Sequence, residues 1–419
     1  MEFDRVLLRE LRTKRSSPLG LLLFGPRQVG KTSLLTRLLE GRHPWIIQLQ
    51  DYEVFQTHLT DAGAFKRQVL ARLESATPAR PLVIMIDEIQ KLPRLLDDCQ
   101  WLLDQHRDRV RLHATGSSAR KLRREGVNLL PGRVRTRALH PLLWREIVGE
   151  IGRRPLVNLS AREPPWAAAL APTSRRWPVP WTDMLGLGTL PGVLVARASD
   201  RVDLLRSYTL TYLREEIQAE ALVRSLEGFS RFLEIAAAES GNATNFQKLG
   251  SEVGLTINTV KNYYSILLDT LVAVRLEPYT KNARRRLALT PKLYLFDLGV
   301  RNAAAGLPIG PALLRLDAGR LFEHWVVLEM IRRISYFGPG ARVAFWRTSD
   351  GSEVDLVLDL PTGPVPIEIK WASRTASLKL SGLHGFMRDH GCRVGYVVGN
   401  FSAPERLDRG VLALPWWWL

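Results

Sequence analysis

One stretch near the N-terminus constrains the fold more than any other part of the chain. Residues 25–33 read GPRQVGKTS, preceded by the apolar run LGLLLFG and followed by a helix-like TSLLTRLLEG. Two glycines in this stretch let the backbone curl so that its N–H groups face phosphate oxygens at a helix N-terminus. Lys31 would reach the β- and γ-phosphates, and the Thr32 hydroxyl would bind Mg²⁺. The sequence therefore predicts an ATP-binding phosphate loop made of Gly25, Pro26, Arg27, Gln28, Val29, Gly30, Lys31, Thr32 and Ser33.

Two acidic residues end a second apolar run. The segment PLVIMIDE (81–88) has the length and composition of a buried strand and closes on Asp87 and Glu88. In a nucleotide hydrolase, Asp87 would hold the Mg²⁺ shell and Glu88 would polarise the attacking water. An apolar strand ending in Asp-Glu is a weak signal alone, but it is a strong one after a phosphate-binding loop.

Strand-like and helix-like segments alternate through the first part of the chain. Apolar runs at 19–25, 45–51, 81–88 and 110–118 are separated by segments of helical period, including 65–76 and 94–106. This alternation predicts an α/β fold in which helices cover both faces of a parallel sheet.

Two further positions are candidates for contact with the γ-phosphate. The fourth predicted strand ends in TGSS (115–118), where a hydroxyl could sense the phosphate, and we favour Ser117. Arg133 directly follows Gly132, and an arginine on such a turn could reach the nucleotide of a neighbouring subunit. A solvated basic loop is the alternative for Arg133, and the sequence leaves both open.

The charge balance indicates a polyanionic partner. The chain has 59 Lys and Arg against 42 Asp and Glu, a net charge of +17, which favours nucleic acid over an anionic membrane surface. An arginine-rich genome is the alternative explanation. Cys99 and Cys392 match no zinc spacing, and no apolar run approaches the ~18 residues of a membrane span. We therefore expect a cytoplasmic protein without structural disulfides.

The length of 419 residues favours more than one domain. We expect a nucleotide-binding core over 1–150, an insertion and helical lid-like region over 151–225, a winged-helix-like domain over 226–305 and a final α/β domain over 306–419. The insertion is rich in Pro, Trp and Arg, and the last residues, PWWWL, look like an exposed aromatic tail.

The middle of the chain carries a DNA-binding pattern. LGSEVGLTINTVKNYY (249–264) reads as two helices around a glycine turn, and a hairpin is expected through 272–296. Side chains able to meet phosphates or base edges lie at the start of the second helix and at the hairpin tip. They are Asn258, Thr259, Lys261 and Asn262 on the helix, and Lys281, Arg284, Arg285 and Arg286 at the tip. The alternative is a helical subdomain that makes protein contacts.

Acidic residues near the C-terminus fall in otherwise apolar segments. Glu323 lies in LFEHWVVLEMIRRI, Asp355 in EVDLVLDL, and Glu368 with Lys370 in VPIEIKW. In a strand, Glu368 and Lys370 point to the same face. Hydrolysis of phosphodiesters needs such a set, because Asp355 and Glu368 would hold Mg²⁺ and the lysine would orient water. A salt bridge between Asp355 and Lys370, in a fold that no longer cuts, is the alternative.

The motifs together resemble two known families. GPRQVGKTS, IDEIQKL, TGSSARKL, GTLPGVL and KLYLFDLGVRNAA are similar to the stand-alone AAA+ ATPases of bacteria and archaea, which carry a C-terminal domain of unknown function. That resemblance implies ATP, Mg²⁺ and a homo-oligomer, with a hexameric ring as one form. The C-terminal acids and lysine resemble the PD-(D/E)xK nuclease superfamily, which implies a restriction-endonuclease-like α/β domain.

These expectations combine into one leading function. The chain is predicted to hydrolyse ATP and act on DNA, with ATP-dependent assembly or movement on duplex or branched DNA and metal-dependent cleavage by the C-terminal domain. One alternative is a nucleotide-switched DNA-binding regulator without nuclease activity. Another is a signalling or toxin-linked ATPase whose partner is a protein.

Overall fold

The computed structural model describes residues 3–14, 17, 19–117, 129–149, 180–212, 226–280, 282, 289–337, 340–408 and 410–419. The chain divides into two compact units. The N-terminal unit comprises Asp4–His140 with Ile266–Val272, and the C-terminal unit comprises Met1–Phe3, Pro141–Ser265 and Ala273–Leu419. Among the described residues, no helix is both long and apolar enough to cross a membrane.

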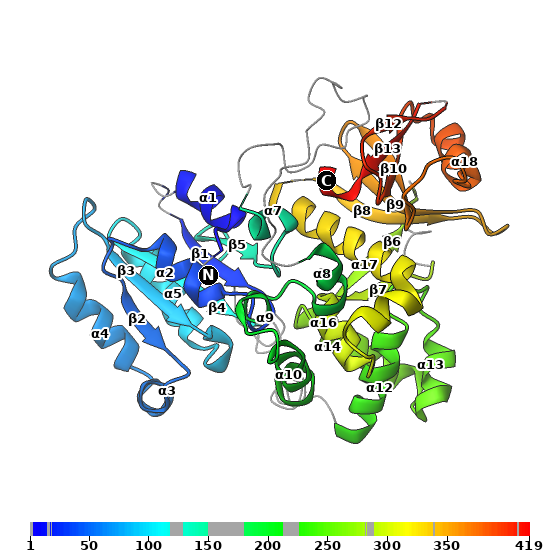
Figure 1. Ribbon diagram of the computed structural model, residues 1–419. Helices are drawn as coiled ribbons and strands as arrows, with labels where there is room; N and C mark the ends of the chain where they lie inside the picture. The colour runs from blue at the N-terminus through cyan, green and yellow to red at the C-terminus, as the bar shows by residue number, and fades with distance from the viewer. Residues whose placement is uncertain are drawn as a thin grey trace. The chain divides into compact units, whose positions relative to one another are not determined.

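A five-stranded parallel sheet forms the centre of the N-terminal unit, in the order β2-β3-β4-β1-β5 (Figure 1). Its strands are β1 (Gly20–Phe24), β2 (Trp45–Gln48), β3 (Leu82–Asp87), β4 (Val110–Gly116) and β5 (Val134–Ala138). Strand β1 lies between β4 and β5, with Leu23 paired to Thr115 on one side and Arg137 on the other. The predicted parallel α/β sheet is confirmed.

Helices cover both faces of this sheet because successive strand residues point to opposite sides. The helices are α1 (Val6–Thr13), α2 (Lys31–Leu38), α3 (Tyr52–Thr60), α4 (Ala64–Leu73) and α5 (Leu95–Gln105). Leu22 and Phe24 of β1 face a core shared with Phe65 of α4 and Leu96 of α5. Leu21 faces the other side, where α1 and α2 pack. Both faces are therefore buried, as an all-parallel sheet requires.

The first part of the C-terminal unit is helical. Its helices are α7 (Trp144–Ile147), α8 (Trp181–Leu187), α9 (Pro191–Val195), α10 (Arg201–Ser207), α12 (Leu226–Ala238), α13 (Phe246–Val253), α14 (Ile257–Asp269) and α16 (Leu298–Ala304), with a π-helix at Tyr208–Tyr212. The last residues of α14, from Ile266, are assigned to the N-terminal unit. Asn245 caps α13 by accepting from the Lys248 N–H, and Gly254 at φ +69° ends it. The predicted pair of helices around a glycine turn is present as α13 and α14.

An eight-stranded mixed sheet follows, in the order β12-β13-β11-β10-β9-β8-β6-β7. Its strands are β6 (Ala273–Pro278), β7 (Lys292–Leu295), β8 (Arg342–Arg347), β9 (Glu353–Leu360), β10 (Gly363–Lys370), β11 (Gly395–Gly399), β12 (Glu405–Arg406) and β13 (Val411–Pro415). The helices α17 (Pro311–Phe337) and α18 (Ser381–His390) contact it. The predicted hairpin is the antiparallel pair β6–β7. Because β6 also pairs with β8, the sheet extends across the domain boundary expected at 305/306.

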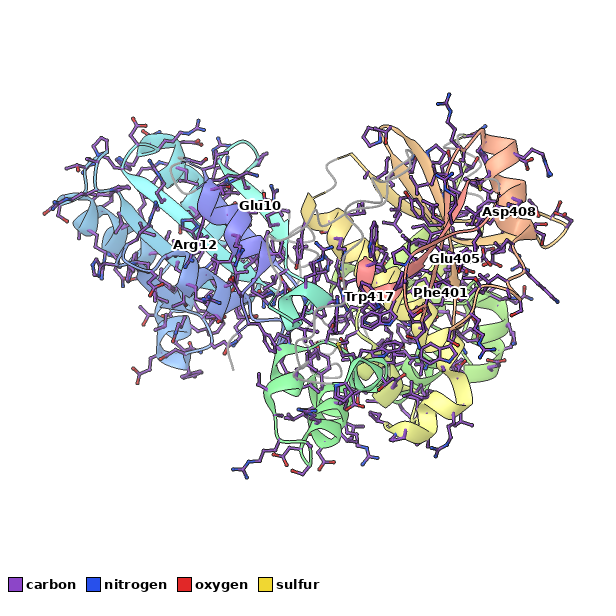
Figure 2. The ribbon with its side chains drawn as sticks, turned by 45° about the horizontal axis from the view of Figure 1, so that its top comes forward. Glu10, Arg12, Phe401, Glu405, Asp408 and Trp417 are labelled. Atoms are coloured by element: carbon purple, nitrogen blue, oxygen red, sulfur yellow. The ribbon has the colours of Figure 1, made fainter. Side chains whose placement is uncertain are left out.

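The C-terminal tail is buried, so the expectation of an exposed aromatic tail is wrong. Trp416 stacks on Trp181 with ring centroids 4.6 Å apart and meets Trp144 edge-on at 4.7 Å. Trp417, labelled in Figure 2, packs partly buried against the same core. The tryptophans directly follow the buried strand β13, so their large apolar side chains pack in the interior of the unit, away from water.

Candidate functional site

The phosphate-binding loop runs from the end of β1 to the start of α2. Gly30 adopts φ +90° at the helix N-cap, and Gln28 also has a positive φ of +63°. Gly25 lies so close to strand β5 that a Cβ there would stand 2.3 Å from the Leu139 carbonyl oxygen. Glycine is therefore required at 25 by close backbone approach and favoured at 30 by conformation. Pro26 and Val29 of the loop are buried, Arg27 and Thr32 are half-buried, and Gln28 and Ser33 are exposed.

Lys31 begins α2 and is 5 % exposed. Its ammonium donates to the carbonyl oxygens of Gly25 and Pro26, each at 3.0 Å, and lies 3.9 Å from a carboxylate oxygen of Glu88. The cation is thus held directly over the curled loop, in the position from which a lysine reaches nucleotide phosphates.

The Thr32 hydroxyl and Asp87 face each other across the site. Thr32 Oγ1 donates to Asp87 Oδ1 at 3.0 Å and lies 3.1 Å from Oδ2. The two residues are 55 positions apart, and they meet because the loop after β1 and the carboxyl end of β3 lie at the same edge of the sheet, on either side of β4. These are the two oxygen-bearing side chains to which the sequence assigns a Mg²⁺ ion, and that assignment stays a prediction.

Glu88 is held in place by residues that the sequence did not single out. Its backbone is left-handed, at φ +59°, and its N–H donates to Thr115 Oγ1 at 3.1 Å. The Gln90 amide donates to the Glu88 carboxylate, and Gln90 Oε1 accepts from the Ser117 N–H at 3.2 Å. Thr115 also donates to Asp87. The hydroxyl in contact with the acidic pair is therefore that of Thr115, whereas Ser117 contacts Gln90 through its backbone.

A buried arginine at the N-cap of α1 holds the phosphate-binding loop in place. Arg5 donates to the carbonyl oxygen of Val29 at 2.9 Å and to that of His140 at 2.6 Å. One guanidinium thus ties the phosphate loop to the end of β5. Nothing in the local sequence marks Arg5, because the contact spans more than twenty residues on one side and 135 on the other.

Comparison with known proteins agrees with this geometry. Residues 18–148 match the model of an AAA domain. The protein is a P-loop ATPase. The C-terminal unit matches two domains of unknown function, DUF8612 over residues 181–309 and DUF4143 over residues 318–419. The ATPase therefore combines an AAA domain, which binds ATP, with a DUF4143 domain at its C-terminal end.

Similar whole proteins are mostly uncharacterized. The ATPase is 26 % identical over 355 residues to an uncharacterized protein of Mycobacterium tuberculosis and to one of Mycobacterium bovis, covering 84 % of this chain and 70 % of each relative. It is also 37 % identical over 76 residues to the cell division control protein 48 homolog B of Arabidopsis thaliana, covering 18 % of this chain and 13 % of that protein. The Walker-type ATPase of Pyrococcus abyssi superposes with a TM-score of 0.47 and 16 % identity, covering 72 % of this chain and 96 % of that one.

Because the Thr115 hydroxyl contacts Asp87 and the Glu88 N–H, substitution of Thr115 should lower ATP hydrolysis more than substitution of Ser117. We expect Thr115→Val to lower kcat for ATP by about tenfold or more, because the isosteric change removes the hydroxyl that orients Asp87 and the Glu88 N–H. Ser117→Ala should lower it by less, since the Ser117 contact to Gln90 is made by the backbone. Steady-state phosphate release with varied ATP measures kcat and KM for both variants. A larger loss in Ser117→Ala would return the sensor role to Ser117.

Arg133 is paired within its own unit. Its guanidinium makes a two-pronged contact with the Asp104 carboxylate, at 2.6 and 2.8 Å, on the exposed side of α5. The hydrogen bond lowers the pKa of the Asp104 carboxyl and raises the pKa of Arg133. An arginine finger at this position would first have to leave Asp104.

The predicted C-terminal set converges on one place in the C-terminal unit. Lys370 Nζ lies 2.5 Å from Glu368 Oε1 and 3.9 Å from Asp355 Oδ2. Asp355 Oδ2 also accepts a hydrogen bond from the backbone N–H of Ile369, the residue before Lys370 on β10, at 2.7 Å. Glu323 lies on α17, the helix that packs on β10, and its carboxylate is near that of Asp355. Residues from α17, β9 and β10 thus form one acidic cluster.

Burial and mutual repulsion show how closely these acids lie. Burial, then the Asp355 charge, raises the pKa of Glu368 to about 7. Burial and the Asp355 charge also raise the pKa of Glu323, and burial raises that of Asp355. Burial alone would lower the pKa of Lys370, but the Asp355 and Glu368 carboxylates outweigh it and raise that pKa. Three carboxyls therefore share a small volume with one ammonium.

Three further residues belong to this acidic cluster and were not predicted. Lys292 of β7 lies 2.7 Å from Glu353 and 3.5 Å from Glu323, and the Tyr294 hydroxyl lies 3.4 Å from Glu323. The charges of Glu323 and Glu353 raise the pKa of Lys292 against the lowering effect of burial. The only local signal was the period of two that places Lys292 and Tyr294 on one face of a strand.

The predicted DNA-contacting residues divide into two groups. Asn258, Lys261 and Asn262 are exposed on α14, and Thr259 is half-buried with its N–H donating to the Thr256 hydroxyl. Lys281, Arg284, Arg285 and Arg286 lie outside the described residues. Three of the four predicted side chains on α14 are therefore accessible to a ligand.

Proposed function

We propose that the protein uses ATP hydrolysis to act on DNA, assembling or moving on duplex or branched DNA, and that its C-terminal domain cleaves phosphodiester bonds with a divalent metal. The observation that carries the cleavage proposal is the convergence of Glu323, Asp355, Glu368 and Lys370 in one cluster. A polar group of this density in an apolar sheet is costly to bury without a purpose. The net charge of +17 supports a polyanionic substrate.

At the ATP site, the residues present suit a magnesium ion. Thr32 and Asp87 offer oxygen ligands within hydrogen-bond distance of each other, and Mg²⁺ in nucleotide sites takes one or two protein ligands beside the phosphates. Lys31 would bind and neutralise the phosphates. Glu88, oriented by Thr115 and Gln90, would orient the attacking water.

In the C-terminal domain, the donor set also suits a divalent cation. Glu368 Oε2 is buried and makes no hydrogen bond in the structure, although its pKa of about 7 allows it to ionise near neutrality. No three His, Cys, Asp or Glu of the described residues form a ready metal cage. Two carboxylates are enough for Mg²⁺, because it keeps waters and binds substrate phosphates for its remaining positions. Asp355 and Glu368 are the residues that would hold it.

The surrounding residues have separate parts in this proposal. A bound cation would supply Lewis-acid polarisation of the scissile phosphate. Lys370 would orient the water and offset charge that develops on the phosphate oxygens, since its ammonium already lies between the two carboxylates. Lys292 would keep Glu323 and Glu353 from repelling the substrate, because it pairs with both.

Cleavage of DNA tests the proposal. Labelled linear, forked and four-way DNA would be incubated with Mg²⁺ or Mn²⁺ and either the wild-type protein or Glu368→Gln. We expect the variant to lose at least about 100-fold in cleavage rate, because it keeps the shape of Glu368 but removes a charge that would hold the metal. ATP hydrolysis should be unchanged.

Strand β9 provides a matched control. Asp355 and Asp359 lie four residues apart on this strand, so their side chains share a face, but Asp359 pairs with Arg342 at the other end. Asp355→Asn should cut poorly while Asp359→Asn cuts at the wild-type rate. Equal rates in both variants and in the wild type, or no cleavage by the wild type on any substrate, would contradict a nuclease role.

A further inference from the structure

A long groove lies in the C-terminal unit, between the α13–α14 helix pair and the last sheet. Its volume is about 1250 Å³, above the range of roughly 300–1,000 Å³ that is usual for small-molecule sites. Its walls come from the N-terminal ends of α13 and α14, the end of β6, the end of β8 and the last residue of α18. The groove is therefore large enough for a chain-like ligand.

The charges along this groove have one sign. Lys261 and Arg347 line it and are exposed, and no Asp or Glu is among the described residues that line it. Apart from His390, the remaining polar lining is made of amides and hydroxyls, which can bind phosphates and base edges. These residues are Thr244, Asn245, Gln247, Thr280, Asn282, Thr290, Thr348 and Ser349. The groove is thus complementary to an extended anion.

Aromatic rings stand beside the cations. Phe246 and Tyr279 line the groove and are only half-buried, so part of each ring is open to it. The Lys261 ammonium lies over the Phe246 ring, 5.8 Å from its centroid, so a phosphate-binding group and an aromatic ring occupy the same part of the groove. The Tyr279 ring also makes edge contacts with Phe386 and His390, at 5.3 and 5.2 Å. Cations interleaved with accessible rings are typical of single-stranded nucleic acid sites.

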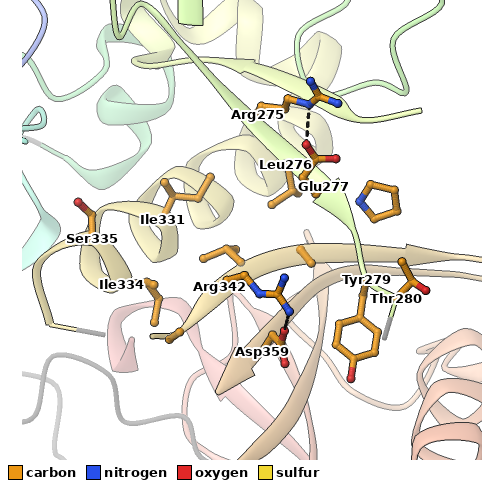
Figure 3. Close-up of a pocket in the computed structure, with 14 residues that line it drawn as sticks. Arg275, Leu276, Glu277, Tyr279, Thr280, Ile331, Ile334, Ser335, Arg342 and Asp359 are labelled. Carbon is orange, nitrogen blue, oxygen red and sulfur yellow. Dashed lines mark hydrogen bonds and ion pairs between the residues drawn. The ribbon is translucent and has the colours of Figure 1, made fainter. Parts of the chain in front are cut away.

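A neighbouring cavity shows the opposite arrangement. It has a volume of about 430 Å³ and is lined by residues of β6, α17, β8 and β9 (Figure 3). Its two arginines are both paired with acids of the same cavity: Arg275 lies 2.7 Å from Glu277, and Arg342 contacts Asp359. The two cavities share Pro278, Tyr279 and Thr280, but among the described residues the lining of the larger one holds cations and no acid.

Side chains that line the groove are neighbours of the acidic cluster. Phe345 lines the groove, and the Lys292 ammonium lies 5.3 Å from its ring centroid. Lys292 in turn contacts Glu323 and Glu353 of the cluster. Arg347 of the groove lies 3.9 Å from Glu353. A strand lying in the groove would therefore pass one side chain away from the carboxylates.

We propose that this groove binds single-stranded DNA, with its phosphates on Lys261 and Arg347 and its bases against Phe246 and Tyr279. The proposal rests on the proposed action on DNA and names the form of substrate that the C-terminal unit holds: a strand separated from its complement. A duplex would keep its bases stacked inside and could not use the rings that line a hollow. The separated strand of a fork or a branch meets this requirement.

Binding without cleavage tests the groove separately from the nuclease. The full chain would be titrated into a fluorescein-labelled oligo-dT of twenty nucleotides, in EDTA, and followed by anisotropy at several salt concentrations. Lys261→Glu with Arg347→Glu should weaken binding by about tenfold or more and lower the salt slope by about 1.4, since each lost phosphate contact accounts for about 0.7. Phe246→Leu should weaken binding by about fivefold and leave the slope unchanged.

Lys248→Glu is the matched control, because Lys248 is an exposed lysine on α13 that pairs with Glu252 and does not line the groove. It should bind like the wild type, and thermal melting would confirm that every variant is folded. Wild-type affinity in the double variant, or tighter binding of the same sequence as a duplex, would overturn the proposal. Cleavage that depends on Glu368 would survive that result, and single-strand binding would survive a failure to cleave.

Discussion

Lys31→Ala is expected to lower ATP hydrolysis by at least about 100-fold and to weaken ATP binding. The ammonium is held over the loop by the Gly25 and Pro26 carbonyl oxygens, and it is the one cation described within 4 Å of Glu88. Removing it leaves the loop N–H groups in place but takes away the positive charge that faces the β- and γ-phosphates. Phosphate release and titration with a fluorescent ATP analogue would measure the two effects.

Two companion variants make this result specific. Lys66→Ala removes a half-buried lysine whose ammonium lies 3.5 Å from the centre of the Trp101 ring, and it should hydrolyse ATP normally. Glu88→Gln should bind ATP as well as the wild type and lose hydrolysis, because it changes the group that orients water and leaves the phosphate contacts intact. Turnover within about twofold of the wild type in Lys31→Ala would refute the assignment of the site.

Glu329→Leu is expected to lower the free energy of unfolding of the C-terminal unit by about 3–5 kcal/mol. Glu329 and Arg333 are each 1 % exposed, lie 2.6 Å apart on successive turns of α17, and Glu329 also accepts from the Trp144 N–H. The variant takes the Glu329 carboxylate away from a buried guanidinium and a buried N–H. Urea denaturation followed by tryptophan fluorescence reports on this region, since Trp144, Trp325 and Trp416 pack together nearby.

An exposed pair with the same spacing provides the control. Glu227 and Arg231 on α12 are also four residues apart, but their side chains are 82 % and 57 % exposed. Removing Glu227 should change the free energy of unfolding by about 0.5 kcal/mol or less. Replacing both Glu329 and Arg333 by leucine should restore much of the lost stability, because the uncompensated charge is gone. A small loss in Glu329→Leu would mean that water reaches the pair.

The nucleotide site was predictable because its residues form continuous motifs at strand and helix ends. β1, α2 and β3 fall where the apolar runs place them. Strand β5 was not predicted, and its sequence VRTRA explains why: it is an edge strand with half-exposed, arginine-rich residues and no apolar run. Thr115 and Gln90 carry no motif of their own and matter only because β3 and β4 are neighbours.

The C-terminal acidic cluster was predictable only in part. Glu323, Asp355, Glu368 and Lys370 could be picked out as charges within apolar segments, and the structure places them together. Lys292, Tyr294 and Glu353 could not, because they reach the cluster through the pairing of β6 with β8 and the packing of α17. The burial of the C-terminal tryptophans likewise depends on where β13 enters the sheet.

The sequence by itself determined the phosphate-binding loop, the acids that end β3 and the alternation that makes a parallel sheet, because these follow from local backbone needs and periodicity. Only the tertiary structure decided which hydroxyl contacts Asp87, which lysines belong to the acidic cluster and which residues line the groove beside α13 and α14. Such contacts join residues far apart in the chain, for example Thr115 and Asp87, 28 positions apart, and Lys292 and Glu323, 31 positions apart. No short-range pattern records such pairings, since strand order and helix packing create them.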